Sequence, residues 1–292
     1  MEEVGITIVR GIGEGSVYAL VAMSMNVIFN ASGILNLAQG EFVVLGGLFA
    51  LLFLPTDTGT VMWVGIGITA ALAIAAMMAA QGYVTLLPLR SSVEQHSWLV
   101  TTLAAAVIIQ SLILIFQGPD PIIVSDPFGT FDFLGVSHPT LYLVLAGLAV
   151  VAFLLLRWFQ SHSLLGLTMN ALRQDLEAAR AGGAPVRRLQ VIAFAIAGLI
   201  VGATGFFGAP VLGLAQSAGI TFALNGFIAA VIGGLGNQLG ALIAGPAIGM
   251  LSVAAIFTIG GEFEEAVGLA VLIVVLLIRP EGVFGRPAAR RV

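Results

Sequence analysis

The sequence predicts an all-α integral membrane protein, a polytopic bundle of about eight to nine transmembrane helices with a broken or re-entrant element near residues 34–54. Of the 292 residues, 59% are hydrophobic and only 9% are charged, and the mean hydropathy is +1.09. Soluble domains carry roughly 25% charged residues, so this chain cannot cover a water-facing surface. Apolar runs of about eighteen or more residues recur along the chain, whereas the alternating segments of a β-barrel do not occur.

The apolar segments follow one another without a soluble domain, so residues 1–292 are expected to form a single membrane unit. The acidic start lacks the basic region of a secretory signal, which predicts that the first segment is a retained helix. The seventh segment is long enough for one strongly tilted helix or for two short ones turning at Gly236-Asn237-Gln238. The segments are 6–29, 34–54, 61–87, 98–117, 140–158, 190–213, 226–258 and 266–278.

The arginines predict how the chain is oriented, because basic loops stay in the cytoplasm. The segment at 160–188, the tail at 279–292 and the short loop with Arg90 are basic and are expected to be cytoplasmic. The connections without a basic residue should face outward, with 118–139 forming an ordered cap on the fourth and fifth helices. If 226–258 crosses twice, this arrangement places the N-terminus outside, unless 34–54 is re-entrant. The outward connections are 55–60, 118–139, 214–224 and the acidic 260–265.

The composition excludes several kinds of chemistry. All eleven basic residues are Arg, so there is no lysine for a nucleotide-binding P-loop or for a Schiff base. There is no Cys for a thiolate metal site, and none of the three His has a metal-ligand neighbour at helical spacing. We therefore expect no enzyme and no bound cofactor or metal, and any ATP-driven work must be powered by another chain.

Polar residues inside the spans are the most informative feature, since such groups in a membrane normally face a cavity or a partner. For isolated cases, an interhelical hydrogen bond is an equally good explanation. Asn36, Gln39 and Glu41 are different, because three polar groups within two turns are hard to satisfy without water or an unwound segment. We expect the element to be interrupted near Asn36 to Gly40, with these side chains facing a central cavity. The other polar residues are Glu14, Asn26, Asn30, Thr101, Thr102, Gln110, Asn225, Asn237 and Gln238.

Two further patterns concern packing and partners. Glycines recur at four-residue spacing, which marks close helix packing within the chain or against a second membrane subunit. The pairs are Gly11/Gly15, Gly198/Gly202, Gly236/Gly240 and Gly245/Gly249. The segment 166–183 is amphipathic and ends at Gly182-Gly183, as a short helix lying across the cytoplasmic ends of the spans would.

Four ordered motifs resemble those of branched-chain amino-acid ABC importer permeases of the Liv H type. They are "GSVYALVAMSMNVIFNASGILNLAQGEFVVLGG", "GLTMNALRQDLEAARAGGAPVRRLQVIAFAIAGLIVGATG", "AVIGGLGNQLGALIAGPAIG" and the closing "IRPEGVFG". Glu177-Ala178-Ala179, followed by Gly183, also resembles the EAA-x3-G loop of ABC importers. Two positions depart from the family pattern: Asn170 stands where Arg is common, with Arg173 one turn away, and Leu37 where Phe is frequent.

The resemblance implies a permease of the bacterial or archaeal plasma membrane that works with a homologous second permease, two cytoplasmic ATPases and an extracytoplasmic binding protein. ATP and Mg²⁺ would be bound by the ATPases, and no nucleic acid would be bound. Branched-chain amino acids are the implied substrates, and urea, short amides and aromatic acids are alternatives. A secondary transporter or channel that works alone is the competing hypothesis, and it predicts a relay of charged groups through several spans.

The resemblance also implies roles for individual residues. The implied translocation pathway comprises Ser16, Tyr18, Asn26, Asn36, Gln39, Gly40, Glu41 and Asn225. The resemblance implies that 160–188, called here the coupling segment, contacts the ATPases. The implied ATPase-coupling residues are Gly166, Leu172, Arg173, Leu176, Glu177, Ala178, Ala179 and Gly183. On docking to the ATPase we expect Leu172, Leu176 and Ala179 to be buried, with Arg173, Asp175 and Glu177 at the rim.

Overall fold

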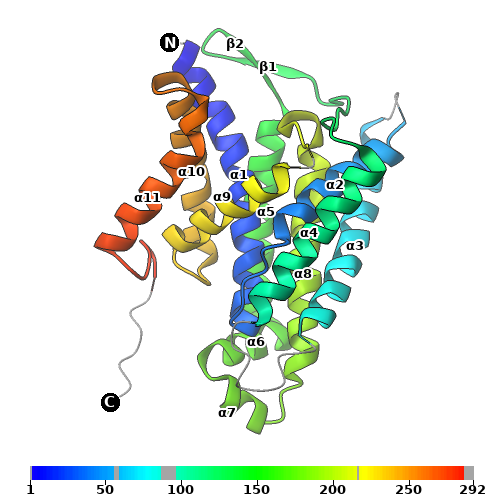
Figure 1. Cartoon of the computed structure of the whole chain (residues 1–292), viewed down its shortest axis with the longest axis vertical. Coiled ribbons are helices and arrows are strands. Elements are labelled where there is room, and N and C mark those ends of the chain that lie inside the picture. Colours follow the sequence, from blue (N-terminus) through cyan, green and yellow to red (C-terminus); the bar gives the residue numbers. More distant parts are fainter. Residues whose placement is uncertain (1, 56–58, 87–96, 216, 286–292) are drawn as a thin grey trace.

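Helices make up most of the computed structural model, which describes residues 2–55, 59–86, 97–215 and 217–285 (Figure 1). The helices are α1 (Glu2–Ser32), α2 (Gln39–Phe53), α3 (Thr60–Thr85), α4 (Ser97–Gln117), α5 (Leu141–His162), α6 (Leu164–Gln174), α7 (Leu176–Ala181), α8 (Val186–Leu212), α9 (Ala218–Gly233), α10 (Gln238–Thr258) and α11 (Glu264–Ile278), with a short 3-10 helix η2 (Gly261–Phe263). Strands β1 (Thr130–Phe133) and β2 (Val136–Pro139) form an antiparallel hairpin. Arg90 and the tail beyond residue 285 lie outside the described residues.

Six helices of the described chain are long and apolar enough to cross a membrane: α1, α3, α4, α5, α8 and α10. Helices α2 and α9 are apolar but have only 15 and 16 residues. A span usually needs about 20 residues, so the predicted eight to nine crossings are not confirmed by length. The structure does agree with the predicted α-helical membrane class, since the chain is mostly helical and the β1–β2 hairpin is its single sheet among the described residues.

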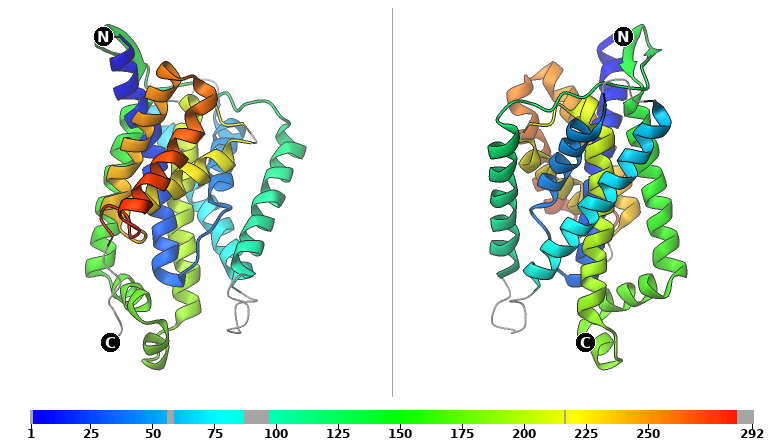
Figure 2. Two further views of the ribbon diagram at one scale, coloured as in Figure 1. Left: turned by 60° about the vertical axis from the view of Figure 1, so that its left-hand side comes forward. Right: turned by 90° about the vertical axis from the view of Figure 1, so that its right-hand side faces the viewer.

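The two ends of the bundle differ in the connections that they carry. Figures 1 and 2 show the N-terminus and the β1–β2 hairpin at one end, called here the hairpin end, and α6 and α7 at the other. The described parts of the arginine-free connections lie at the hairpin end, and the arginine-rich 160–188 lies at the α6–α7 end. The chain thus separates its basic and non-basic connections as the arginines predict, and α1 begins on the non-basic side.

The connection 118–139 is ordered, as predicted, but it packs on different elements from those expected. Leu134 and Gly135 both have positive φ (51° and 84°) and form the two-residue turn between β1 and β2. Leu134 packs on the start of α1, because a Cβ added at Gly5 would lie 3.2 Å from its Cβ. Ile122 N donates to Leu214 O at 2.7 Å and joins the loop to the end of α8.

The long segment 226–258 forms two helices rather than one tilted helix. Helix α9 ends at Gly233, and Gly234 and Gly236 adopt φ of 90° and 82°, which residues with a Cβ rarely adopt. The Asn237 side chain then caps α10, accepting hydrogen bonds from Leu239 N (3.1 Å) and Gly240 N (3.2 Å). Helix α9 therefore runs inward from the hairpin end, and α10 returns to it (Figure 2).

Helix α1 lies in the middle of the bundle and packs most closely on α10 through glycines. A Cβ added at Gly15 would lie 2.5 Å from Pro246 Cα, and one added at Gly249 would lie 2.5 Å from Gly15 Cα. Gly198 and Gly202 pack in the same way on Ile74 and its neighbours in α3. The four glycine pairs thus serve packing within the chain, the first of the two predicted alternatives.

We expect Gly249→Ala to lower the thermal unfolding temperature of the purified chain, because its new methyl group overlaps the backbone of α1. Overpacking of this kind costs about 1–3 kcal/mol, which exceeds the helix propensity of about 1 kcal/mol that alanine gains over glycine. The matched control is Gly147→Ala in α5, where an added Cβ meets nothing within 4 Å. The control should be neutral or slightly stabilising. Equal unfolding temperatures for the two variants in detergent would contradict this packing argument.

Candidate functional site

The helical path is interrupted between α1 and α2, where the sequence predicts it. Gly33 ends α1 with φ of 71°, residues 34–36 are not helical, and α2 begins at Gln39. Asn36 Oδ1 accepts a hydrogen bond from Ala38 N at 3.1 Å and so shapes the turn into α2. Its Nδ2 donates to Gln81 Oε1 at 2.9 Å, while Gln81 Nε2 donates back to Asn36 Oδ1 at 3.2 Å. This pair of amides fastens the interruption to α3.

The next two polar residues of the cluster contact α1 and α9. Gln39 Nε2 donates to Ser24 Oγ in α1 at 2.6 Å. The Glu41 carboxylate lies against Gly219 in the first turn of α9, where the helix dipole favours a negative charge. Gly40 permits this contact, since a Cβ there would lie 2.8 Å from Ala223 N.

The expectation that these side chains face a central cavity is wrong. Asn36 and Gln39 are fully buried and Glu41 is 2% exposed, all of them packed among helices of the same chain. The Asn36 amide has its partner on α3, and the amide nitrogen of Gln39 has its partner on α1. Gln39 Oε1 and Glu41 Oε2 have no hydrogen-bond partner among the described residues.

The turn between α9 and α10 is held by two asparagines of α1. Asn26 Oδ1 accepts from Gly236 N at 2.8 Å, and its Nδ2 donates to Asn237 O at 3.1 Å. Asn30 Nδ2 donates to Gly236 O at 3.1 Å. Asn26, which the resemblance placed in the translocation pathway, is fully buried. In this structure its side chain fixes the position of the α9–α10 turn.

The same turn contacts the predicted coupling segment. Arg173 Nη1, at the end of α6, donates to Gly236 O at 3.3 Å, the carbonyl that Asn30 also reaches. The C-terminal segment packs on the other side of the turn, where Asn237 Nδ2 donates to Phe284 O at 2.9 Å. The turn therefore joins α1, α6, α9, α10 and the segment after α11.

The remaining pathway residues are not part of this group. Ser16 Oγ donates within α1 to Ile12 O at 2.6 Å, and Asn225 is buried between α9 and α11, near Gly268. The Tyr18 ring lies 6.5 Å from that of Phe222 and lines a separate cavity of about 200 Å³ at the hairpin end. Sequence reasoning missed Gln81, although a lone amide in an apolar run was a signal for it.

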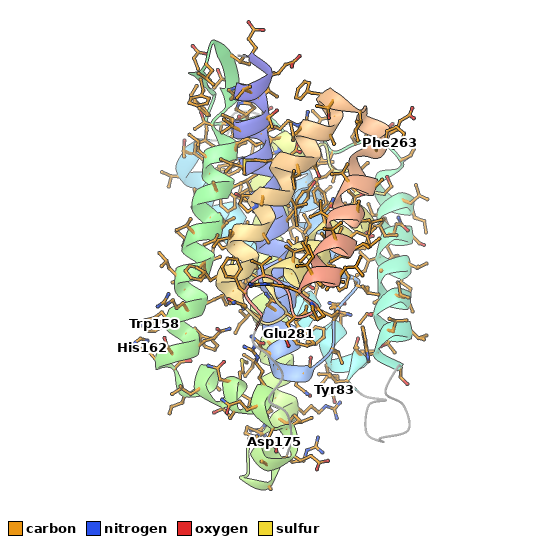
Figure 3. The ribbon with its side chains drawn as sticks, turned by 90° about the vertical axis from the view of Figure 1, so that its left-hand side faces the viewer. Tyr83, Trp158, His162, Asp175, Phe263 and Glu281 are labelled. Carbon is orange, nitrogen blue, oxygen red and sulfur yellow. The ribbon has the colours of Figure 1, made fainter. Side chains whose placement is uncertain are left out.

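The coupling segment folds as two helices, where the sequence suggested one. Asp175 leaves the helical conformation (φ −154°, ψ 106°) and caps α7 by accepting from Glu177 N (3.0 Å) and Ala178 N (2.9 Å). Gly166 packs α6 onto the end of α5, since a Cβ there would lie 2.7 Å from Gln160 Cα. Gly183 follows α7 with φ of 85°. Figure 3 shows Asp175 at the far end of the molecule from Phe263.

The predicted division of this segment into buried and rim residues needs correction. Leu172 is 4% exposed and already buried in the chain's own core, and Leu176 and Ala179 are half-buried against it. Arg173 is exposed, as Asp175 and Glu177 are, and its Nη1 also donates to Gly236 O of the same chain. The reason is that the apolar face of the segment packs on this chain. Glu177 and Ala178 are exposed and free to meet a partner.

Asn170, which stands where the family pattern has Arg, packs on a different element from Arg173. Its Nδ2 donates to Gln160 O in α5 at 2.9 Å, whereas Arg173, one turn away, reaches Gly236 O. Among the described residues there is no group of three or more His, Asp and Glu side chains that could hold a metal ion.

Comparisons with known proteins agree with this arrangement of motifs. The family model for the branched-chain amino acid transport system permease component matches residues 7–276. The chain is 27% identical to the high-affinity branched-chain amino acid transport system permease protein LivH of Escherichia coli K12, over 97% of this chain and 96% of that protein.

Two other relatives come from the same organism. The permease protein LivM is 26% identical over 91% of this chain and 67% of its own length. The ribose import permease protein RbsC is 27% identical over 79% of this chain and 73% of its own length. With a family model that matches nearly its whole length, the chain belongs to the permease family of branched-chain amino acid transport systems.

Proposed function

We propose that this chain is the permease subunit of an ATP-binding-cassette importer for a small organic solute, a branched-chain or related amino acid. The observation that carries this is the family match over residues 7–276, at nearly full length in LivH. Its likeness to both LivH and LivM of one organism supports assembly with a homologous second permease. Urea, short amides and aromatic acids are the alternative substrates.

The proposed complex contains two cytoplasmic ATPases, which bind ATP and Mg²⁺, and an extracytoplasmic binding protein. The chain itself lacks lysine, so it has no P-loop residue for a nucleotide phosphate. The basic α6–α7 end is cytoplasmic in this proposal, the C-terminus lies on the same side, and α2, α9 and α11 complete a count of eight to nine crossings.

The structure supports a route from the ATPases to the bundle. The α7 surface around Glu177 and Ala178 is exposed, while the preceding α6 reaches Gly236 through Arg173. A displacement of α7 by an ATPase would be transmitted through α6 to the α9–α10 turn and to α1. This route would connect the ATPase subunits, which use ATP, with the helices that surround the cluster of Asn36, Gln39 and Glu41.

The test is reconstitution in vesicles with the second permease, the ATPases and the binding protein. We expect ATP-dependent uptake of radiolabelled L-leucine that requires every component, and no ATP hydrolysis by the purified chain alone. Uptake by the chain alone in an imposed proton or sodium gradient would instead identify a secondary transporter. ATP hydrolysis by the rigorously purified chain would also refute the proposal.

A further inference from the structure

A small cavity at the hairpin end contains a pair of opposite charges, Arg10 and Glu14. The cavity has a volume of about 200 Å³ and lies between α1, the end of α8 and the start of α9. Its lining includes Arg10, Glu14, Tyr18, Leu212, Thr221 and Phe222. The two charged side chains both come from α1, while α8 and α9 contribute apolar groups and the hydroxyl of Thr221.

The two charges form an ion pair within α1. Arg10 Nε donates to Glu14 Oε1 at 2.7 Å, and the side chains are 43% and 13% exposed. A pair at this spacing contributes about 0.3–0.5 kcal/mol to a helix, and the order with the acid first is the better one. Placing a charge inside a membrane costs about 2.5–3.5 kcal/mol at the helix centre and less near its end. The pair therefore adds little to the stability of α1.

The rest of the cavity fits a compact solute with an apolar part. Tyr18 and Phe222 are 4% and 7% exposed, with ring centroids 6.5 Å apart, and Leu212 extends the apolar wall. Pockets for drug-sized ligands measure about 300–1,000 Å³, so this smaller cavity suits a molecule the size of an amino acid.

We propose that this cavity is a binding site for a zwitterionic α-amino acid, with Arg10 binding the carboxylate and Glu14 the ammonium group. A zwitterion matches both charges with its own adjacent opposite charges and leaves neither side chain uncompensated. A solute with a single charge pairs with one of them and repels the other, and a neutral solute pairs with neither. The site rests on the proposed function, and it adds the residues that select the substrate class on the outer side.

The test measures binding of radiolabelled L-leucine to the purified chain in nanodiscs, with unlabelled competitors. Leucine itself should compete, while 4-methylpentanoate, which lacks the ammonium group, and 3-methylbutylamine, which lacks the carboxylate, should compete at least tenfold more weakly. Arg10→Gln and Glu14→Gln should each weaken leucine binding at least tenfold. The charge-exchanged variant R10E/E14R keeps both charges in the cavity and should regain binding to within about threefold of the wild type.

The matched control is Arg157→Gln, which removes an exposed arginine from α5 at the opposite end of the bundle and should leave binding unchanged. Size-exclusion profiles and helical content identify variants that fail to fold. If a single variant fails to fold, leucine binding by the folded R10E/E14R variant still tests the assignment. The assignment is wrong if wild-type chain binds no leucine, if both single variants bind it as tightly as wild type, or if the singly charged analogues compete equally. The assay contains no partner subunit, so its outcome is separate from that of the transport test. Leucine binding by the chain can be absent while the full complex takes up leucine, and binding can be present while ATP-driven uptake is absent.

Discussion

Gly236→Ala is expected to lower the stability of this chain by several kcal/mol, because it combines backbone strain, overlap and displaced hydrogen bonds. A Cβ at this position would overlap Asn30 Oδ1 and lie 3.1 Å from Arg173 Cζ. The φ of 82° adds backbone strain of about 1–2 kcal/mol, and overpacking adds about 1–3 kcal/mol. The displaced hydrogen bonds to Asn26, Asn30 and Arg173 contribute further, at about 1 kcal/mol each.

The matched control is Gly33→Ala, which has a φ of 71° but meets nothing within 4 Å. It carries the strain without the overlap, so it should destabilise by about 1–2 kcal/mol. The measurement is thermal unfolding of both variants in detergent, together with ATP-driven leucine uptake after reconstitution. If Gly236→Ala unfolds at the same temperature as Gly33→Ala and transports like the wild type, the turn is not the junction described here.

Ala178→Trp is expected to abolish ATP-driven uptake while leaving the chain folded. Ala178 is exposed in the short helix α7, so a large side chain there can extend from the surface and would block a close-fitting ATPase surface. Uptake and leucine-stimulated ATP hydrolysis should fall at least tenfold in the reconstituted complex. The unfolding temperature of the purified subunit should not change.

This position is a sharper probe of docking than Leu176, which the sequence alone suggests. Leu176 is half-buried against the chain's own core, so a polar replacement there would disturb α7 even without a partner. The matched control is Ala104→Trp, an exposed alanine of α4 far from α7. Wild-type transport by a normally assembled Ala178→Trp complex would show that this surface of α7 does not meet the ATPase.

Much of the architecture was predictable because it depends on local chemistry. The interruption near Asn36 to Gly40, the two helices of 226–258 and the close packing of Gly11/Gly15 follow from residues whose conformational preferences act over a few positions. The hairpin at 118–139 was expected as ordered structure for similar reasons, from its prolines and large apolar residues.

The partners of the buried polar groups could not be predicted, because they are distant in sequence. Asn26 and Asn30 bind backbone groups 206 to 211 positions away, and no local pattern records such a pairing. The amphipathic pattern of the coupling segment likewise does not indicate whether its apolar face packs on its own chain or on another chain. Leu172 was therefore expected at an interface, although it lies in the core.

The turn at Gly236 has a consequence for how the protein is made. Helix α1 is synthesised first, yet the backbone groups that satisfy Asn26 and Asn30 follow 206 to 211 residues later. At typical elongation rates of about 5–20 residues per second, that delay is roughly 10–40 s. During this interval the two asparagines in the nascent membrane helix require temporary partners, such as water, lipid headgroups or the insertion machinery. Substitutions at Gly236 would then reduce the yield of inserted protein as well as the stability of the finished bundle.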